Sequence, residues 1–190
     1  MANKITGCVF DLDGTLADTA PDIALALNKS LNDAGYRQLS LESVKRMIGN
    51  GIPVLVRRAL FHVEAPDNLA PDVITSMLSY SRKYYCEKSS LMHGVENCLE
   101  GLKKRAIPMS VCTNKDETVA QMVVSALGLN SYFNTIVGSR PDLVKKPDPS
   151  MLQIAAEAIN SPIETTMMIG DSEVDAATGI AASSISVIVR

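Results

Sequence analysis

The sequence predicts an α/β fold in which an open parallel sheet carries a helical insertion after its first strand. From about residue 91 onward, short apolar strands alternate with helical segments. This alternation is typical of a parallel sheet with right-handed crossovers. Between the first strand and that point, roughly 70 residues show helical patterns and no convincing strand. The helical block therefore interrupts the sheet after its first strand.

The first strand and the insertion follow from apolar patterns and helix signals. Ile5–Phe10 is a short apolar run that ends in a polar loop, as a buried strand does. In Thr19–Gly35, Pro21 and Asp22 suit a first helical turn, and apolar residues recur on one face until Gly35. Three more helices are expected at Leu41–Ile48, Ile52–Phe61 and Pro71–Glu87. We therefore expect a discontinuous core, 1–15 and 89–190, and a helical insertion, 16–88.

The rest of the core is expected to alternate regularly. The expected helices are Val95–Arg105, Glu117–Leu127, Ser150–Ile159 and Val174–Ala182, and the expected strands are Met109–Cys112, Thr135–Val137, Thr166–Ile169 and Ile185–Val189. A last strand of this kind would usually be covered by a further helix. Because the sequence stops one residue after it, we expect either a truncated chain or another element over that edge.

Composition and charge narrow the range of functions. Eighteen Lys and Arg against 21 Asp and Glu give a net charge of −3, which disfavours nucleic acid or an anionic membrane as the main partner. No apolar run approaches the roughly 18 residues of a membrane span, and the apolar start is too short for a signal peptide. The unpaired spacing of Cys8, Cys86, Cys98 and Cys112 favours buried free thiols over a zinc site. A cytoplasmic location is expected, and the oligomeric state is left open.

Polar residues at the strand ends gather the candidate chemistry at one edge of the sheet. They lie in four segments: Asp11-Leu12-Asp13-Gly14-Thr15 after the first strand, Thr113-Asn114-Lys115 after the second, Lys145-Lys146-Pro147-Asp148-Pro149 in the loop after the third, and Gly170-Asp171-Ser172 with Asp175 after the fourth. Open parallel sheets bind ligands at the carboxyl ends of their strands. We therefore expect these side chains to converge.

Such a cluster favours Mg²⁺ and a phosphate group. Carboxylates within about 4–6 Å of one another repel and require a counter-charge. Carboxylate oxygens without a nearby histidine or cysteine select Mg²⁺ over zinc, and a lysine, a hydroxyl and loop amides suit an incoming phosphate. An aspartate paired with a metal is ionised at neutral pH and can attack phosphorus in line. A second carboxylate two residues on can protonate the leaving oxygen and then activate water.

Four segments together resemble the signature motifs of the haloacid dehalogenase-like hydrolase superfamily. They are Asp11-Leu12-Asp13-Gly14-Thr15-Leu16, Thr113-Asn114, Lys146-Pro147 and Gly170-Asp171-Ser172 with Asp175. Within it, the chain looks most like the phosphoglycolate phosphatases, to which Ile48–Gly51, Thr113–Lys115, Ala126–Leu129 and Lys146–Pro149 are similar. The resemblance implies a Rossmann-like, doubly wound parallel sheet core with an inserted helical cap domain. It also implies a Mg²⁺-dependent phosphatase that hydrolyses a small phosphorylated metabolite, with 2-phosphoglycolate favoured, through an aspartyl-phosphate intermediate.

The resemblance further implies the roles of single residues. Asp11 is similar to the family's nucleophile and Asp13 to its general acid/base, with the Asp13 backbone carbonyl on Mg²⁺. Lys146, rather than Lys145, resembles the lysine that neutralises nucleophile and phosphate. The expected metal ligands are Asp11, Asp13, Asp171 and Asp175, the last directly or through water. The expected substrate-binding residues are Gly14, Thr113 and Asn114 in the core and Asn50 and Gly51 in a mobile lid.

Two departures from the family pattern and two rival functions remain. Ala181–Ser184 lacks the usual Ala-Gly, which concerns a helix end, and Gly138–Asp142 differs from the commoner Gly-Gly-Asp loop.

A phosphosugar mutase would share the catalytic set, but it would need an aspartyl-phosphate that outlives reorientation of the substrate. A receiver-like signalling module could carry the same aspartate cluster, although it needs no helical insertion.

Overall fold

The computed structural model describes residues 4–189, and the chain divides into two compact units. The core unit comprises Met1–Asp18 and Leu91–Arg190, and the helical unit comprises Thr19–Ser90. The chain passes from one unit to the other through two short strands, β2 (Ala17–Asp18) and β3 (Ser90–Leu91), which pair with each other. Each of these strands has two residues, too few for a periodic pattern to predict them from the sequence.

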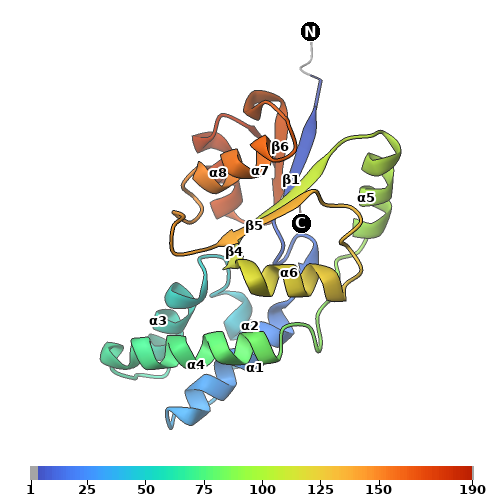
Figure 1. Cartoon of the computed structure of the whole chain (residues 1–190). Coiled ribbons are helices and arrows are strands. Elements are labelled where there is room, and N and C mark those ends of the chain that lie inside the picture. The colour runs from blue at the N-terminus through green and yellow to red at the C-terminus, as the bar shows by residue number, and fades with distance from the viewer. Residues whose placement is uncertain (1–3, 190) are drawn as a thin grey trace. The chain divides into compact units, whose positions relative to one another are not determined.

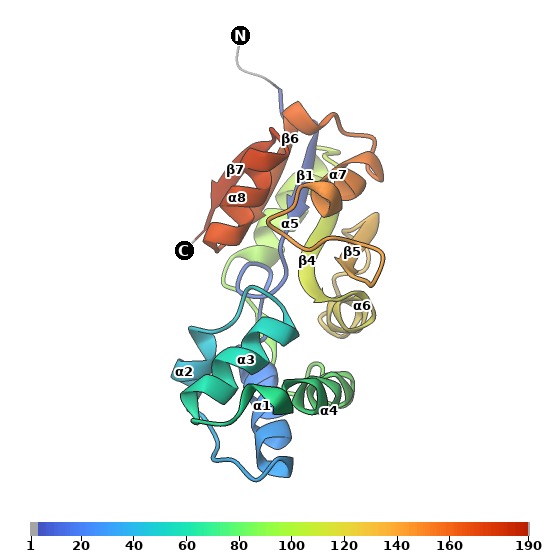
Figure 2. The same ribbon diagram turned by 90° about the vertical axis from the view of Figure 1, so that its left-hand side faces the viewer.

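The core unit is built on a parallel sheet of five strands in the order β5-β4-β1-β6-β7 (Figures 1 and 2). The strands are β1 (Gly7–Phe10), β4 (Met109–Asp116), β5 (Thr135–Ser139), β6 (Thr166–Gly170) and β7 (Ile185–Ile188). All four neighbouring pairs are parallel. The expected α/β fold with a Rossmann-like sheet is therefore confirmed, and the central strand β1 is the point at which the strand order reverses.

Helices cover both faces of this sheet (Figure 2). They are α5 (Val95–Lys104), α6 (Glu117–Ala126), α7 (Ser150–Glu157) and α8 (Glu173–Ala181), with a short 3₁₀ turn, η2 (Ile163–Thr165). Successive side chains of a strand point to opposite faces. On one face Val9 and Met168 pack with Met151 and Leu152 of α7 in a buried cluster.

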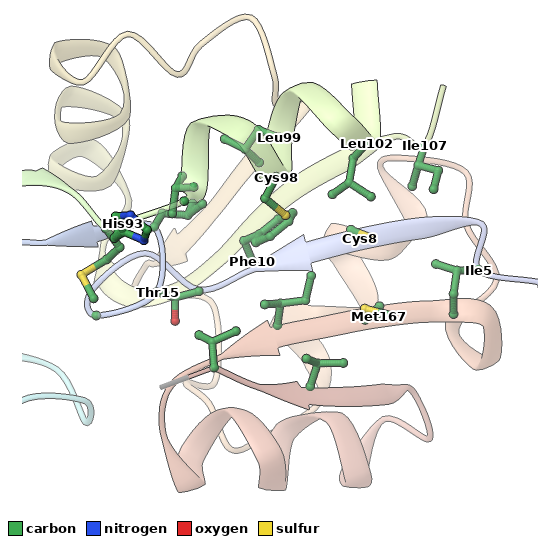
Figure 3. A pocket seen from close by; sticks show the side chains of 18 residues that line it. Ile5, Cys8, Phe10, Thr15, His93, Cys98, Leu99, Leu102, Ile107 and Met167 are labelled. Atoms are coloured by element: carbon green, nitrogen blue, oxygen red, sulfur yellow. The ribbon is translucent and has the colours of Figure 1, made fainter. Parts of the chain in front are cut away.

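The other face of the sheet carries α5 and an apolar groove. Phe10 and Ile169 line this groove together with Cys98 and Leu102 of α5, and its volume is about 510 Å³ (Figure 3). No carboxylate is found among the described residues that line it. The groove is therefore distinct in its chemistry from the polar carboxyl edge of the sheet.

The helical unit has a buried core of its own, which includes Leu27, Leu31, Leu60 and Met77. Its helices are α1 (Ala20–Asp33), α2 (Leu41–Lys45), α3 (Ile52–His62) and α4 (Ala70–Lys83), with a 3₁₀ turn, η1 (Asp67–Leu69). A buried Asp22 carboxylate accepts hydrogen bonds from the Lys88 and Ser89 backbone N–H groups and from the Ser89 hydroxyl. Asp22 thus does more than start a helix, because it fixes the end of the unit to its beginning.

Several sequence expectations on element ends and side-chain burial are wrong. The helix expected to reach Ile48 ends at Lys45, and Gly49 in the following loop has a φ of 120°, which helical backbone does not adopt. The helix expected to reach Glu87 ends at Lys83. Of the four cysteines, all free, Cys8 and Cys112 are buried, whereas Cys98 is exposed. Among the described residues, no helix is both long and apolar enough to cross a bilayer.

Candidate active site

Asp11 directly follows the central strand, at the carboxyl edge where the strand order reverses. Its backbone N–H donates to the Ile169 carbonyl of β6 at 2.8 Å. The residue is 8% exposed. One carboxylate oxygen, Oδ1, is buried and has no hydrogen-bond partner among the described residues. This strand end therefore presents a buried carboxylate oxygen that accepts no hydrogen bond from the described residues.

Lys146 supplies the positive charge beside Asp11. Its Nζ lies 2.9 Å from Asp11 Oδ1, as an ion pair without hydrogen-bond geometry, and donates to Asp175 Oδ1 at 2.6 Å. Burial alone would lower the pKa of Lys146, but the neighbouring Asp11 and Asp175 carboxylates raise it above its ordinary value. The ammonium is therefore a permanent charge between two carboxylates.

Asn114 holds the Lys146 backbone in place. Its side-chain Nδ2 donates to the Lys146 carbonyl at 3.0 Å, and its Oδ1 accepts from the Lys146 N–H at 2.9 Å. These two bonds tie the end of β4 to the loop that carries the lysine. The structure thus gives Asn114 a positioning contact, and its expected binding of phosphate stays a prediction.

Asp175 is fixed by the start of α8. The Ser172 N–H and hydroxyl both donate to Asp175 Oδ2, at 3.1 and 2.6 Å, and the Ser172 side chain in turn accepts from the Asp175 N–H. This is a capping box. A Cβ at Gly170 would lie 2.3 Å from the Asp175 Cβ, so the carboxylate fits there only because residue 170 is glycine. Both Asp175 oxygens are thereby committed to protein donors.

Asp171 lies on the open side of the cluster. The residue is exposed, and the Thr15 hydroxyl donates to its Oδ1 at 2.9 Å. Gly14 has a φ of 89°, and a Cβ there would lie 2.4 Å from Asp171 Oδ2. Glycine is therefore required at position 14 both by its backbone conformation and by the Asp171 carboxylate. Its expected close approach to a phosphate stays a prediction.

Three of the four expected metal-ligating residues meet at one point. Carboxylate oxygens of Asp11, Asp171 and Asp175 lie within 4.8 Å of one another. The pKa of Asp11 is raised to about 7, chiefly by burial, with smaller contributions from the Asp175 and Asp13 charges and against the lowering effect of Lys146. A hard-oxygen donor set with a bare, buried oxygen fits Mg²⁺, which would supply the missing positive charge.

Asp13 and Thr113 occupy the neighbouring strand ends. The Asp13 carboxylate is not in the three-aspartate cluster, because its Oδ1 accepts from Lys115 Nζ at 2.8 Å. The Thr113 hydroxyl is buried and accepts a 3.3 Å hydrogen bond from the Lys115 N–H. Because a hydroxyl that accepts a hydrogen bond can also donate one, the Thr113 side chain is able to donate to a ligand oxygen. The metal contact expected from the Asp13 backbone carbonyl stays a prediction.

Two of the remaining expected site residues lie in the other unit of the chain. Asn50 and Gly51 belong to the helical unit, in the loop that precedes α3, where Gly51 is the residue before the first helical turn. Their expected contact with substrate therefore stays a prediction. Lys145 is a neighbour of Asp116, and burial lowers its pKa. Among the described residues, Lys146 rather than Lys145 contacts the carboxylates.

Comparison with known proteins decides the family. The model of the haloacid dehalogenase-like hydrolases matches residues 8–189. The chain belongs to this family. A phosphoglycolate phosphatase from Cereibacter sphaeroides is 37% identical over 178 residues, which cover 93% of this chain and 81% of that protein. Such relatives indicate a phosphoric monoester hydrolase, as the motifs predict, and disfavour the receiver-like alternative.

Solved structures of the family show the same architecture. A predicted phosphoglycolate phosphatase from Haemophilus somnus has a TM-score of 0.89 at 27% identity, over 99% of this chain and 86% of that one. A β-phosphoglucomutase from Clostridium difficile has a TM-score of 0.81 at 20% identity, over 98% of this chain and 85% of that one. At that identity the mutase shares the fold alone, so it gives no support to the mutase function.

Three residues of this hydrolase site stand in the strand-end segments recognised from the sequence, but the sequence reasoning assigned them no role of their own. They are Thr15, which orients Asp171, Ser172, which holds Asp175, and Lys115, which pairs with Asp13. The pattern Ser172-x-x-Asp175 could have revealed one of them, because a serine followed three residues later by an acid is typical of a capping box. Lys115 stands beside Thr113-Asn114, but its partner Asp13 follows a different strand, so no local pattern links the two residues.

Proposed function

We propose that the chain is a Mg²⁺-dependent phosphatase that hydrolyses a small phosphomonoester through an aspartyl-phosphate on Asp11. The observation that carries this proposal is the buried Asp11 carboxylate, which forms an ion pair with Lys146, accepts no hydrogen bond at Oδ1 from the described residues, and lies beside two further carboxylates. The phosphoglycolate phosphatases among the relatives make 2-phosphoglycolate the favoured substrate. A cytoplasmic location is part of the same proposal, because small phosphorylated metabolites are found there.

In the first step Asp11 is the nucleophile. A carboxylate oxygen attacks phosphorus in line, an O–P bond forms, and the bond from phosphorus to the ester oxygen breaks. Lys146, held by Asp175 at 2.6 Å, offsets the charge on Asp11 and the phosphate. The Thr113 hydroxyl donates to a phosphate oxygen. Asp13 gives its proton to the departing ester oxygen, so the product leaves as an alcohol.

In the second step Asp13 acts as the base. It takes a proton from water, the resulting hydroxide oxygen attacks phosphorus, and the bond from phosphorus to Asp11 breaks. Inorganic phosphate is released and both aspartates return to their starting states. When bound, Mg²⁺ would be held by Asp11, Asp171 and the Asp13 carbonyl, and would supply positive charge opposite the phosphate. Because both Asp175 oxygens already accept hydrogen bonds, Asp175 would hold a metal-bound water rather than the ion.

Phosphate release from a panel of phosphomonoesters tests this function. We expect Mg²⁺-dependent, repeated release of inorganic phosphate. The kcat/KM for 2-phosphoglycolate is expected to exceed the values for glycerol, sugar and nucleoside monophosphates. A mutase would instead isomerise β-glucose 1-phosphate without net phosphate release. If the purified protein with saturating Mg²⁺ releases phosphate from none of the esters in the panel, the proposal is contradicted.

We further propose that the helical unit is a cap and that Asn50 and Gly51 contribute to specificity. A lid that excludes bulk water favours formation of the aspartyl-phosphate, and such lids often select substrates. Asn50→Ala and Gly51→Ala are expected to change the ratio of kcat/KM values for 2-phosphoglycolate and p-nitrophenyl phosphate markedly. Asn68→Ala, at an exposed position of the same unit, is the control. An unchanged ratio, with both rates falling together, would mean that the loop only supports the fold.

A further inference from the structure

A second lysine contacts the proposed general acid and has no role so far. Lys115 Nζ donates to Asp13 Oδ1 at 2.8 Å, and the two side chains are only 11% and 15% exposed. Lys115 stands near the end of β4 and Asp13 just after β1, and these strands are neighbours in the sheet. The backbone at Lys115 is fixed by its hydrogen bond to Thr113. The ammonium is therefore held at the carboxyl edge of the sheet.

Other cations of the core unit are placed differently. Lys146 lies between Asp11 and Asp175, on the side of the nucleophile. Arg140 pairs with Glu117 and Asp142. Lys115 by contrast contacts the residue that must reach the leaving group. Lys115 therefore contacts the proposed acid, Asp13, and not the nucleophile, Asp11.

The contact locates Lys115 relative to the substrate. A general acid lies within about 2.6–3.2 Å of the ester oxygen that it protonates. An ammonium 2.8 Å from that acid then lies within roughly 6 Å of the same ester oxygen. The oxygens of a carboxylate on the carbon next to this ester oxygen lie three bonds from it, on the leaving-group side. The substrate carboxylate can thus come within hydrogen-bond distance of the Lys115 ammonium.

We propose that Lys115 binds the carboxylate of the substrate's alcohol portion. The substrate class is then phosphomonoesters that carry a carboxylate on the carbon bonded to the ester oxygen. An ammonium has three donors, of which Asp13 takes one. Lys115 can therefore bridge Asp13 and the substrate, which aligns the acid with the ester oxygen. This inference rests on the proposed phosphatase function and deepens it by naming a specificity-determining residue.

Paired substrates with matched lysine variants test this role. Lys115→Met removes the charge at the site, and Lys104→Met removes one from an exposed position at the end of α5. The substrates are 2-phosphoglycolate and 2-hydroxyethyl phosphate, which has a hydroxymethyl group in place of the carboxylate. We expect Lys115→Met to lower the ratio of their kcat/KM values by about 10- to 100-fold, mainly through a higher KM for 2-phosphoglycolate. Lys104→Met is expected to leave the ratio unchanged.

The outcomes separate this inference from the function on which it rests. Equal losses for both esters in Lys115→Met would mean that Lys115 only orients Asp13, and would overturn the carboxylate contact. Lys115→Arg keeps the charge and is expected to retain most of the preference, while Lys115→Gln replaces the Met variant should the latter not fold. If the unaltered protein hydrolyses other phosphomonoesters of the panel but neither of these two, this inference alone is overturned. If it releases phosphate from no ester of the panel, the proposed function is overturned, and this inference with it.

Discussion

Asp11→Asn is expected to lower turnover by about four to six orders of magnitude, the scale seen when a covalent nucleophile is removed. The amide keeps the shape of the side chain, but it has no anionic oxygen to attack phosphorus and is a poor metal ligand. Initial rates of phosphate release at saturating Mg²⁺ measure the effect. Asp142→Asn, which changes an exposed carboxylate of the same unit, is the control. Near-normal turnover in a homogeneous Asp11→Asn sample would remove Asp11 from the mechanism.

The same substitution is expected to stabilise the protein when no metal is present. Burial raises the pKa of Asp11 to about 7 from an ordinary value of 3.8. Between these values the folded state holds a proton that the unfolded state has lost, so the free energy of unfolding falls as the pH rises through this window. Asparagine has no such charge to bury. In EDTA, Asp11→Asn should therefore melt above the unaltered protein, and by more at pH 8 than at pH 5.

Thermal unfolding at both pH values checks this expectation. Mg²⁺ should raise the melting temperature of the unaltered protein more than that of Asp11→Asn, because an ion that binds only the folded state stabilises it by mass action. A lower melting temperature for Asp11→Asn at pH 8 in EDTA would mean that the attraction between Asp11 and Lys146 outweighs the cost of burying the carboxylate. The negative charge of Asp11 would then favour both the activity and the stability of the protein.

The sequence was sufficient to predict the sheet and the gathering of its motifs, because both depend on local patterns. A buried strand such as Gly7–Phe10 is a short apolar run, and topology alone brings the carboxyl ends of parallel strands together. The end of β4 was less predictable. It continues to Asp116 through an irregular register after Cys112, so Thr113 and Asn114 belong to the strand itself rather than to a loop after it.

The contacts that set the chemistry lie beyond a sequence pattern. Asn114 and Lys146 are 32 residues apart and Asp13 and Lys115 are 102 apart, and no periodicity links side chains over such separations. The raised pKa of Asp11 depends on its degree of burial, which a motif does not report. Asn50 and Gly51 belong to a separate unit of the chain, and no motif links them to the strand-end residues. Their role therefore stays a prediction.

Removal of Mg²⁺ is expected to abolish activity and leave the fold intact. Three carboxylates with oxygens within 4.8 Å of one another repel when ionised, and Lys146 is a single counter-charge beside them. Each unit has an apolar core of its own, so we expect folding not to require the ion. After EDTA treatment we expect phosphate release to fall to background, the far-ultraviolet circular dichroism to be unchanged, and activity to return when Mg²⁺ is added back.

Ca²⁺ is expected to inhibit rather than to replace Mg²⁺. It takes six to eight oxygen ligands at 2.3–2.6 Å, whereas Mg²⁺ holds six at 2.0–2.1 Å. The larger ion can therefore take both oxygens of a carboxylate, and an Asp11 oxygen captured in this way is not free to attack phosphorus. Rates measured with each ion alone, and with Ca²⁺ added to the Mg²⁺-loaded protein, distinguish the two roles. Full activity with Ca²⁺ alone, or undiminished activity in EDTA, would contradict the proposal that Mg²⁺ acts at this strand edge.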